Sequence, residues 1–201
     1  AAMAVLKLEQ AGVNPAAGPV AVTGASGGSG SIAVAILAER GYDVTAFTGR
    51  REAADYLVSL GAARVEARPD TSGKRPLEKG QWAGAVDTVG GSTLAWLTRT
   101  AAPGASIAAF GNAGGNTLNA TVLPFILRGI NLLGVTVTFP SDAVRTRTWN
   151  LLEESLRPEA LNAIASEIAF DELDSALASI VEEGIRGRVV VRIAEREADA
   201  P

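Results

Sequence analysis

Short apolar runs alternate with longer amphipathic segments along most of this chain, and glycine separates many of them. Residues 20–22 predict a buried strand, a glycine-rich string follows at 23–30, and the almost uninterrupted apolar residues 31–38 predict a helix. Gly41 suits a left-handed helix stop, and residues 43–47 predict a second strand. A strand, a glycine turn, a helix and a second strand within about thirty residues form one βαβ unit.

The same alternation continues toward the C-terminus. Further strands are predicted at residues 64–67, 84–86, 105–109 and 132–138, the third of them after a Pro103-Gly104 turn. Helices are predicted at residues 2–11, 52–60 and 121–128. One more helix is expected to begin at Ser92, which would cap it. Because helices separate the strands, we expect the α/β class, as a Rossmann doubly wound parallel six-stranded sheet in the order 3-2-1-4-5-6.

Beyond residue 140 the pattern predicts a helix begun by Ser141, a short strand near Ile168, a helix over 171–183 and a strand over 188–193. The apolar side chains of the first of these helices, Trp149, Leu151 and Leu152, are expected to pack in the core. We therefore expect a Rossmann domain over residues 1–140, helices and strands that complete it over 141–193, and a frayed polar tail over 194–201.

The glycine turn has a physical use in this position. Small residues let the backbone pass close to a pyrophosphate, and the unpaired amides at the start of the helix favour its negative charge. Glycine turns also close strands for structural reasons alone, but the surrounding strand, helix and strand favour dinucleotide binding over that alternative.

The tip of the second strand indicates which dinucleotide is bound. Folds specific for NAD usually carry an Asp or Glu there, whereas this chain has Thr48-Gly49-Arg50-Arg51. Arginine donates fork-shaped, charge-assisted hydrogen bonds to phosphate oxygens, so a 2′-phosphate and hence NADP(H) are predicted. The alternative is that Arg50 and Arg51 are solvated residues at the start of a helix, with no ligand.

Composition narrows the possible functions. The 201 residues are 47% hydrophobic and carry a formal net charge of −4 with dispersed Lys and Arg, so no nucleic-acid partner is expected. No apolar run is long enough to span a bilayer, and the first ten residues lack the features of a signal peptide, so we expect no membrane association and a cytoplasmic location. A cluster of Lys74, Arg75 and Lys79 could meet the adenosine phosphates, although a solvated loop is the favoured interpretation.

The chain contains neither cysteine nor histidine. It therefore offers no Cys or His zinc ligand and no histidine general base, and we predict no metal site. Chemistry must rest on a cofactor, on backbone dipoles or on residues outside this chain, so the catalytic residues stay unassigned.

The string TGASGGSG also satisfies the TGxxxGxG pattern of short-chain dehydrogenases. That family needs a Tyr-x-x-x-Lys pair for proton transfer. Here Tyr42 is followed four residues later by Ala46, and Tyr56 by Leu60. The resemblance to short-chain dehydrogenases therefore fails at the catalytic centre.

A second resemblance covers nearly the whole chain. The matching stretches are VTGASGGSGSIAVAILAERGYDV, TGR, ADYLVSLGA, RPLEKGQWAGAVDTVGG, GNAGG, TVLPFILRGINLLGV and GRVVVRI. They resemble the cofactor-binding half of zinc-independent medium-chain dehydrogenase/reductases, in the quinone-oxidoreductase-like branch that includes NADPH-dependent acrylyl-CoA reductases. The resemblance implies cofactor contacts at the pyrophosphate from Ser26, Gly27, Gly28, Ser29 and Gly30, at the 2′-phosphate from Thr48, Gly49 and Arg50, and near the nicotinamide from Phe110, Asn112, Val135 and Thr136.

Two departures from that family stand out. Ser29 occupies a position where valine is usual, and Thr136-Val137-Thr138 replaces Asp-Ser-Val. The resemblance also implies a GroES-like catalytic domain, of which this chain shows no part, and segments at 167–170 and 188–193 that return to pair with it. We therefore read the chain as a domain or fragment.

The resemblance implies hydride transfer from NADPH to an activated alkene, such as acrylyl-CoA or another 2-enoyl-CoA, or to a quinone. It also implies a homodimer joined through the sixth strand. The alternative hypothesis is a catalytically silent nucleotide-binding or dimerisation module. A third is a fragment stabilised only by strand exchange between copies.

Overall fold

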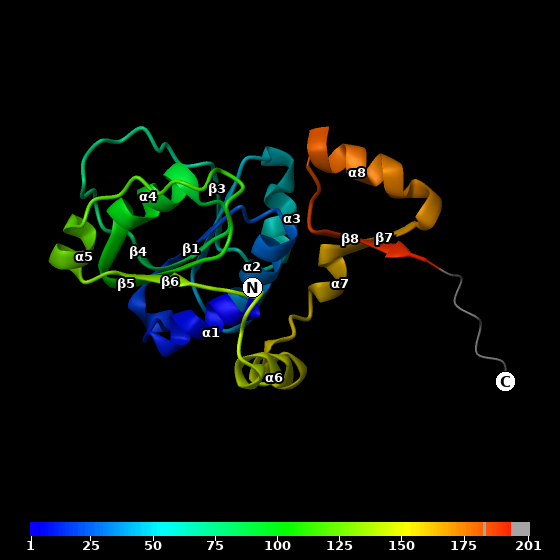
Figure 1. Ribbon diagram of the computed structural model, residues 1–201, viewed down its shortest axis with the longest axis horizontal. Helices are drawn as coiled ribbons and strands as arrows, with labels where there is room; N and C mark the ends of the chain where they lie inside the picture. The colour runs from blue at the N-terminus through cyan, green and yellow to red at the C-terminus, as the bar shows by residue number, and fades with distance from the viewer. Residues whose placement is uncertain (183, 194–201) are drawn as a thin grey trace.

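Six parallel strands form the centre of the computed structural model, which describes residues 1–182 and 184–193 (Figure 1). The strands are β1 (Val20–Thr23), β2 (Val44–Thr48), β3 (Arg64–Ala67), β4 (Trp82–Asp87), β5 (Ala101–Ala109) and β6 (Asn131–Gly134). Their order, β3-β2-β1-β4-β5-β6, confirms the predicted Rossmann topology. The tail predicted over 194–201 lies outside the described residues.

One face of the sheet is covered by α1 (Ala2–Gln10), α2 (Gly28–Glu39) and α3 (Ala54–Ser59), which follows the short 3₁₀ helix η2 (Arg51–Ala53). Small and branched side chains fill this layer, with Val5 and Leu8 of α1, Leu37 of α2 and Leu57 of α3 all fully buried. The apolar pattern along α2 is nearly continuous because neighbours surround this helix on most sides.

The opposite face carries α4 (Gly91–Thr100) and α5 (Leu123–Arg128). Three aromatic rings lie at its centre. Phe47 packs edge-on against Trp82 and Trp96, with ring centroids 5.5 Å and 5.2 Å apart. Trp82 is buried because its indole nitrogen finds a partner, the Thr100 hydroxyl at 3.2 Å.

Several predicted boundaries were wrong. The fourth strand was predicted from residue 84 but begins at Trp82. The fifth was predicted from residue 105 but begins at Ala101. The predicted Pro103-Gly104 turn therefore lies inside β5, where the pairing with β4 changes register. The sixth strand ends at Gly134, although β-branched residues continue to Thr138, because its register with β5 ends there. Ser92 does not cap α4, whose N-cap is Gly90.

The chain then leaves the sheet through the C-terminal elements. These are α6 (Asp142–Leu151), the π-helical segment η3 (Leu152–Leu156), α7 (Leu161–Ile164), β7 (Ala165–Ala169), the 3₁₀ turn η4 (Phe170–Glu172), α8 (Leu173–Glu182) and β8 (Arg188–Arg192). Strands β7 and β8 pair with each other in parallel and form a second, two-stranded sheet beside the main one (Figure 1). Within the residues that the structure describes, no helix is long and apolar enough to cross a bilayer.

Trp149 was wrongly predicted to lie in the core, since 63% of its surface is exposed. Leu151 and Leu152 do pack against the core cluster. Ser141 caps α6 as predicted, with its hydroxyl accepting a hydrogen bond from Val144 N at 3.4 Å.

Candidate functional site

A cavity of about 520 Å³ opens at the carboxyl ends of the strands. Every strand from β1 to β5 contributes its tip or the loop that follows it, and the lining residues are Thr23, Gly24, Ser26, Gly27, Phe47, Thr48, Gly49, Arg50, Arg68, Pro69, Thr71, Thr88, Val89, Ser92, Thr93, Ala113 and Gly114. The sheet order reverses between β1 and β4, and open α/β sheets bind their ligands in the crevice at such a point.

The glycine turn forms one wall of this cavity. Helix α2 begins at Gly28, three residues earlier than predicted, so Gly28, Ser29 and Gly30 make up its first turn and Gly27 is its N-cap. A Cβ on Gly30 would lie 2.8 Å from Ala25 Cα, because the helix starts directly against the end of β1. Only glycine permits this close approach. Ser26 and Gly27, the N-cap of α2, line the cavity, whereas Gly28, Ser29 and Gly30 are not among the lining residues.

The tip of β2 forms the second wall. The hydroxyls of Ser26 and Thr48 share a buried hydrogen bond of 2.8 Å, and Arg50 N donates to Thr48 Oγ1 at 3.1 Å. The Arg50 guanidinium donates to Ile185 O at 2.8 Å, so it links β2 to the C-terminal segment. Arg51, predicted as the second cation, is exposed at the start of η2 and is not among the lining residues.

The charge of the lining is one-sided. Arg50 and Arg68 are positive, and the lining residues, all within the described part of the chain, include no Asp or Glu. This is notable in a chain whose formal net charge is −4. An anionic ligand is therefore favoured in the cavity.

The carboxylate of Asp87 lies beneath this cavity at the end of β4. It accepts hydrogen bonds from Thr23 Oγ1 at 2.6 Å and from Gly90 N at 2.8 Å, which connects β1 to the start of α4. Burial raises the pKa of the Asp87 carboxyl, and the hydrogen bonds from Thr23, Gly90 and Val89 act in the opposite direction. Asp87 therefore has a structural part in shaping the crevice.

The residues predicted for the nicotinamide end lie on two neighbouring strand tips. Phe110 and Asn112 follow β5, whereas Val135 and Thr136 follow β6. Val135 is buried and its amide donates to Ala109 O, and the amide nitrogen of the Asn112 side chain donates to Asn116 Oδ1. None of these four residues lines the 520 Å³ cavity, which the neighbouring Ala113 and Gly114 do reach.

Arg188 reaches the glycine turn from the C-terminal segment, and sequence reasoning missed it. Its guanidinium donates to Ser29 Oγ at 2.9 Å, and its Cζ would lie 2.6 Å from a Cβ on Gly28. Gly187 N donates to Ser26 O at 2.9 Å, and the Arg186 guanidinium lies over the Tyr56 ring. The segment from Gly184 to Arg188 thus runs along the glycine turn and adds a cation to it.

These residues suit a phosphate-bearing dinucleotide. The cavity is lined by the N-cap of α2, by several other glycines and by the guanidiniums of Arg50 and Arg68. Within residues 1–182 and 184–193, by contrast, no three His, Cys, Asp or Glu side chains gather as a metal site would require.

Comparison with known proteins agrees with this geometry. Residues 28–154 match the family model described as zinc-binding dehydrogenase. The chain belongs to the zinc-binding dehydrogenase family. It resembles specifically the cofactor-binding half of medium-chain reductases in this family, as the sequence predicted. Since it contains no cysteine or histidine, this half of a zinc-binding dehydrogenase cannot supply Cys or His ligands to zinc.

Two curated relatives cover almost the whole chain. Acrylyl-CoA reductase AcuI of Ruegeria pomeroyi is 48% identical over 195 residues, which are 96% of this chain and 59% of the relative. YhfP of Bacillus subtilis, named as a candidate quinone oxidoreductase, is 46% identical over 196 residues. This zinc-binding dehydrogenase chain therefore spans about 59% of the length of the curated relatives it matches.

Solved structures of such dehydrogenases share the fold closely. YhdH of Escherichia coli K-12 with bound NADPH superposes with a TM-score of 0.91 at 45% identity, over 96% of this chain and 60% of that one. YhfP of Bacillus subtilis with bound NAD superposes with a TM-score of 0.90 at 46% identity, over 96% of this chain and 59% of that one.

The close approach at Gly30 predicts a cost for any side chain there. Replacing Gly30 with Ala should lower the free energy of unfolding by about 1–3 kcal/mol, because α2 must move away from β1. Urea denaturation would measure this loss. The matched control is Gly134→Ala, whose Cβ would meet nothing within 4 Å. Equal stabilities of the two variants would contradict the steric argument.

The raised pKa of Asp87 predicts a pH dependence of stability. The unfolded chain releases this proton near the ordinary value of 3.8, whereas the folded chain retains it to higher pH. Asp87 therefore contributes less to stability as the pH rises from about 4 through its folded pKa. Comparing urea denaturation of the native chain and Asp87→Asn across this range should show the native chain losing stability relative to the variant. A difference that is constant with pH would refute the assignment.

Proposed function

We propose that this chain is the NADP(H)-binding part of an NADPH-dependent medium-chain reductase that transfers hydride to an activated alkene, acrylyl-CoA or another 2-enoyl-CoA, or to a quinone. The observation that carries the proposal is the acid-free cavity with Arg50 and Arg68 beside the glycine turn. NAD-specific folds usually carry a carboxylate that binds the ribose 2′-hydroxyl. This cavity has cations instead, and these suit a 2′-phosphate.

The relatives support the proposal in their names and ligands. AcuI of Ruegeria pomeroyi is an acrylyl-CoA reductase, and YhdH of Escherichia coli was solved with NADPH. YhfP was solved with NAD, so the preference between the two dinucleotides has to be measured for this chain. We also propose that the reaction is independent of zinc and that a GroES-like catalytic domain completes the substrate pocket.

The residues of this chain would act mainly by binding and orientation. The first turn of α2 would hold the pyrophosphate, with the Arg188 guanidinium beside it at Ser29. Thr48, Gly49 and Arg50 would receive the 2′-phosphate, and Phe110, Asn112, Val135 and Thr136 would border the nicotinamide. When bound, the reduced nicotinamide supplies the hydride. The protein's contribution is to hold the reacting carbons in line and to exclude water.

A second candidate is a nucleotide-binding or dimerisation module without catalysis of its own. It is favoured by the lining of the cavity, whose described residues include no Tyr, Lys, Asp or Glu that could transfer a proton. Turnover separates the two candidates. NADPH binding without NADPH consumption in the presence of acrylyl-CoA or a quinone would support the second for the isolated chain.

Titration calorimetry with NADPH and NADH tests the cofactor assignment. We expect the native chain to bind NADPH more tightly, and Arg50→Glu to weaken NADPH binding about 10–100-fold while leaving NADH binding nearly unchanged, because the added carboxylate repels the 2′-phosphate. Arg51→Glu is the matched control, since Arg51 is exposed beside Arg50 and lies off the cavity. Equal losses for both dinucleotides would remove Arg50 from the 2′-phosphate site.

We further propose that the chain forms a homodimer through the edge of β6. The other edge strand, β3, carries the charged side chains of Arg64 and Glu66, which discourage pairing. Strand β6 (Asn131–Gly134) carries no charge, and the neighbouring α5 region exposes Val122, Ile126 and Leu127. An uncharged edge beside exposed apolar residues suits a second copy of the sheet.

Sedimentation equilibrium tests the dimer. The native chain should sediment as a dimer, and Ile126→Glu should shift it toward the monomer, because a buried carboxylate at the interface is costly. Val58→Glu serves as the control, since Val58 is similarly exposed on α3 on the other side of the sheet. A native monomer, or an equal effect of both variants, would exclude the β6 interface.

A further inference from the structure

A second cavity, of about 780 Å³, shares no lining residue with the nucleotide cavity. It is enclosed by the start of α1, by Ile32 of α2, by the segment that follows β6, and by α6 with the residues after it. Figure 1 shows α6 apart from the main sheet, on the same side as α1. None of the residues proposed to bind the dinucleotide lines this second cavity.

The interior of the second cavity is apolar. Its buried and half-buried lining residues include Ala2, Met3, Ile32, Leu152, Pro158 and Leu161. Thr148 is the polar exception, and its hydroxyl already donates to Val144 O at 2.8 Å. The interior therefore offers a ligand contacts with carbon rather than hydrogen bonds, and it suits an apolar group.

Two exposed apolar side chains form the edge of this cavity. Trp149 belongs to neither core cluster and lines the cavity with 63% of its surface exposed. Val137 also lines it and is 65% exposed, at a position where serine is usual in the resembling family. An indole and a branched side chain that remain uncovered beside an apolar cavity favour a ligand that covers them.

The second cavity begins next to the proposed position of the nicotinamide. Val137 directly follows Thr136, which we proposed to border the nicotinamide. The start of this segment is tied to α1, because Lys7 Nζ donates to Gly134 O at 2.6 Å. A ligand group held in the second cavity would therefore extend from the point at which the hydride is delivered.

Two guanidiniums stand at the exposed rim of the second cavity. Arg145 and Arg157 line the cavity, are exposed, and take part in none of the ion pairs found in the described ranges, 1–182 and 184–193. Glu153 is the acidic residue of the lining, so the two arginines leave the rim with a net positive charge. The rim therefore attracts the anionic part of a ligand whose apolar part lies inside.

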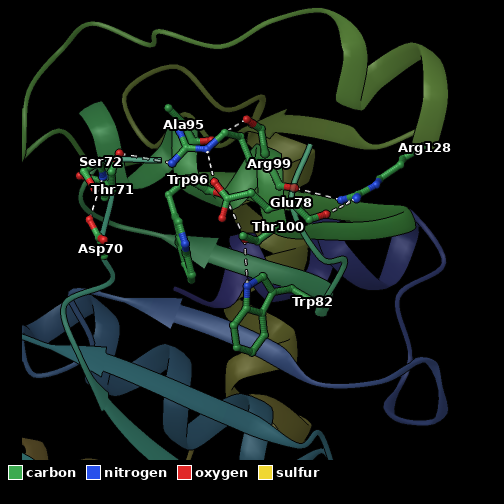
Figure 2. A network of polar contacts seen from close by, with 11 residues as sticks. Asp70, Thr71, Ser72, Glu78, Trp82, Ala95, Trp96, Arg99, Thr100 and Arg128 are labelled. Atoms are coloured by element: carbon green, nitrogen blue, oxygen red, sulfur yellow. Dashed lines mark hydrogen bonds and ion pairs between the residues drawn. The ribbon is translucent and has the colours of Figure 1, made fainter. Parts of the chain in front are cut away.

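Other arginines of this protein are occupied by structural contacts. Figure 2 shows Arg99 of α4 in a polar network, with its Nε 2.9 Å from Glu78 Oε1. Arg128 donates to Ala101 O at 2.7 Å and to Arg99 O at 3.0 Å. These contacts hold the loop that follows β3 against α4. The two rim arginines make no such link among the described residues, so their donors are available to a ligand.

We propose that the second cavity binds the acyl chain of a 2-enoyl-CoA longer than acrylyl-CoA, with Trp149 as a specificity-determining residue. The acyl chain lies in the apolar interior, and the reacting alkene lies at the edge beside Val137. The coenzyme A part leaves past Arg145 and Arg157, whose charges attract its phosphates. The inference rests on the proposed function, since it names the alkene that the reductase would take. A quinone carries no charge for these two arginines to attract.

Titration of the native protein with propionyl-CoA and octanoyl-CoA tests the acyl site. These saturated esters cannot accept a hydride, so binding alone is measured. Each methylene that is fully buried tightens binding up to about fourfold, so octanoyl-CoA should bind at least about tenfold more tightly than propionyl-CoA. Trp82 and Trp96 are buried, so the fluorescence change should come from Trp149, with emission at shorter wavelength when octanoyl-CoA covers it.

Variants of the apolar edge locate the site. By calorimetry, Trp149→Ala should reduce the preference for octanoyl-CoA over propionyl-CoA to less than about threefold, because the indole no longer covers the acyl chain. The matched control is Val144→Ala, since Val144 is exposed on the same helix and lies off the cavity. This control should keep the native preference.

Variants of the rim test the charge argument. Arg145→Gln and Arg157→Gln should each weaken the binding of both esters about 3–10-fold without changing the preference between them. Arg147→Gln is the matched control, because Arg147 is exposed on α6 and does not line the cavity. An equal loss in all three variants would show only a general effect of charge and would refute the role of the rim.

The remaining outcomes separate this inference from the function on which it rests. Equal affinities for the two esters, or an unchanged preference in Trp149→Ala, would refute the acyl site. Octanoate binding as tightly as octanoyl-CoA would refute the thioester, and tighter binding of menadione would indicate a quinone instead. If the native protein binds NADPH in any of these cases, the proposed function stands without the inference. If it binds neither NADPH nor NADH, the proposed function itself fails.

Discussion

The hydrogen bond between the Thr23 hydroxyl and the Asp87 carboxylate is the constraint on which the crevice depends. It joins the ends of β1 and β4 at 2.6 Å, at the point where the strand order reverses. Asp87 also accepts from Gly90 N at 2.8 Å and so sets where α4 begins. These donors offset part of the cost of burying the carboxylate, although burial still raises its pKa. The bonds also fix the gap between the loops that follow β1 and β4.

The walls of that gap are built by backbone as much as by side chains. Gly30 lets α2 start directly against β1, and the N-cap of this helix, Gly27, lines the cavity. The loop that follows β3, held by Arg99 and Arg128, supplies further lining residues. The two cations of the cavity, Arg50 and Arg68, directly follow the neighbouring strands β2 and β3.

The C-terminal segment connects this cavity to the smaller β7–β8 sheet. Gly187 and Arg188 lie along the glycine turn, and Ile185 holds the Arg50 guanidinium. Residues more than 130 positions apart in the chain therefore meet beside the cavity. Arg50 thus contacts both the cavity and the segment that leads into β8.

The sequence by itself determined the features that depend on local pattern. These are the βαβ unit at 20–47, the positions of the strands, the strand order and the basic tip at Arg50, since periodicity, glycine and charge type are local properties. The tertiary structure alone decided which cations share a cavity. Arg68 becomes a neighbour of Gly49 through the β2–β3 register, and Arg188 reaches Ser29 across 159 positions. It also decided that Trp149 is exposed and that β6 ends at Gly134, because burial and strand length depend on the neighbours a residue finds in space.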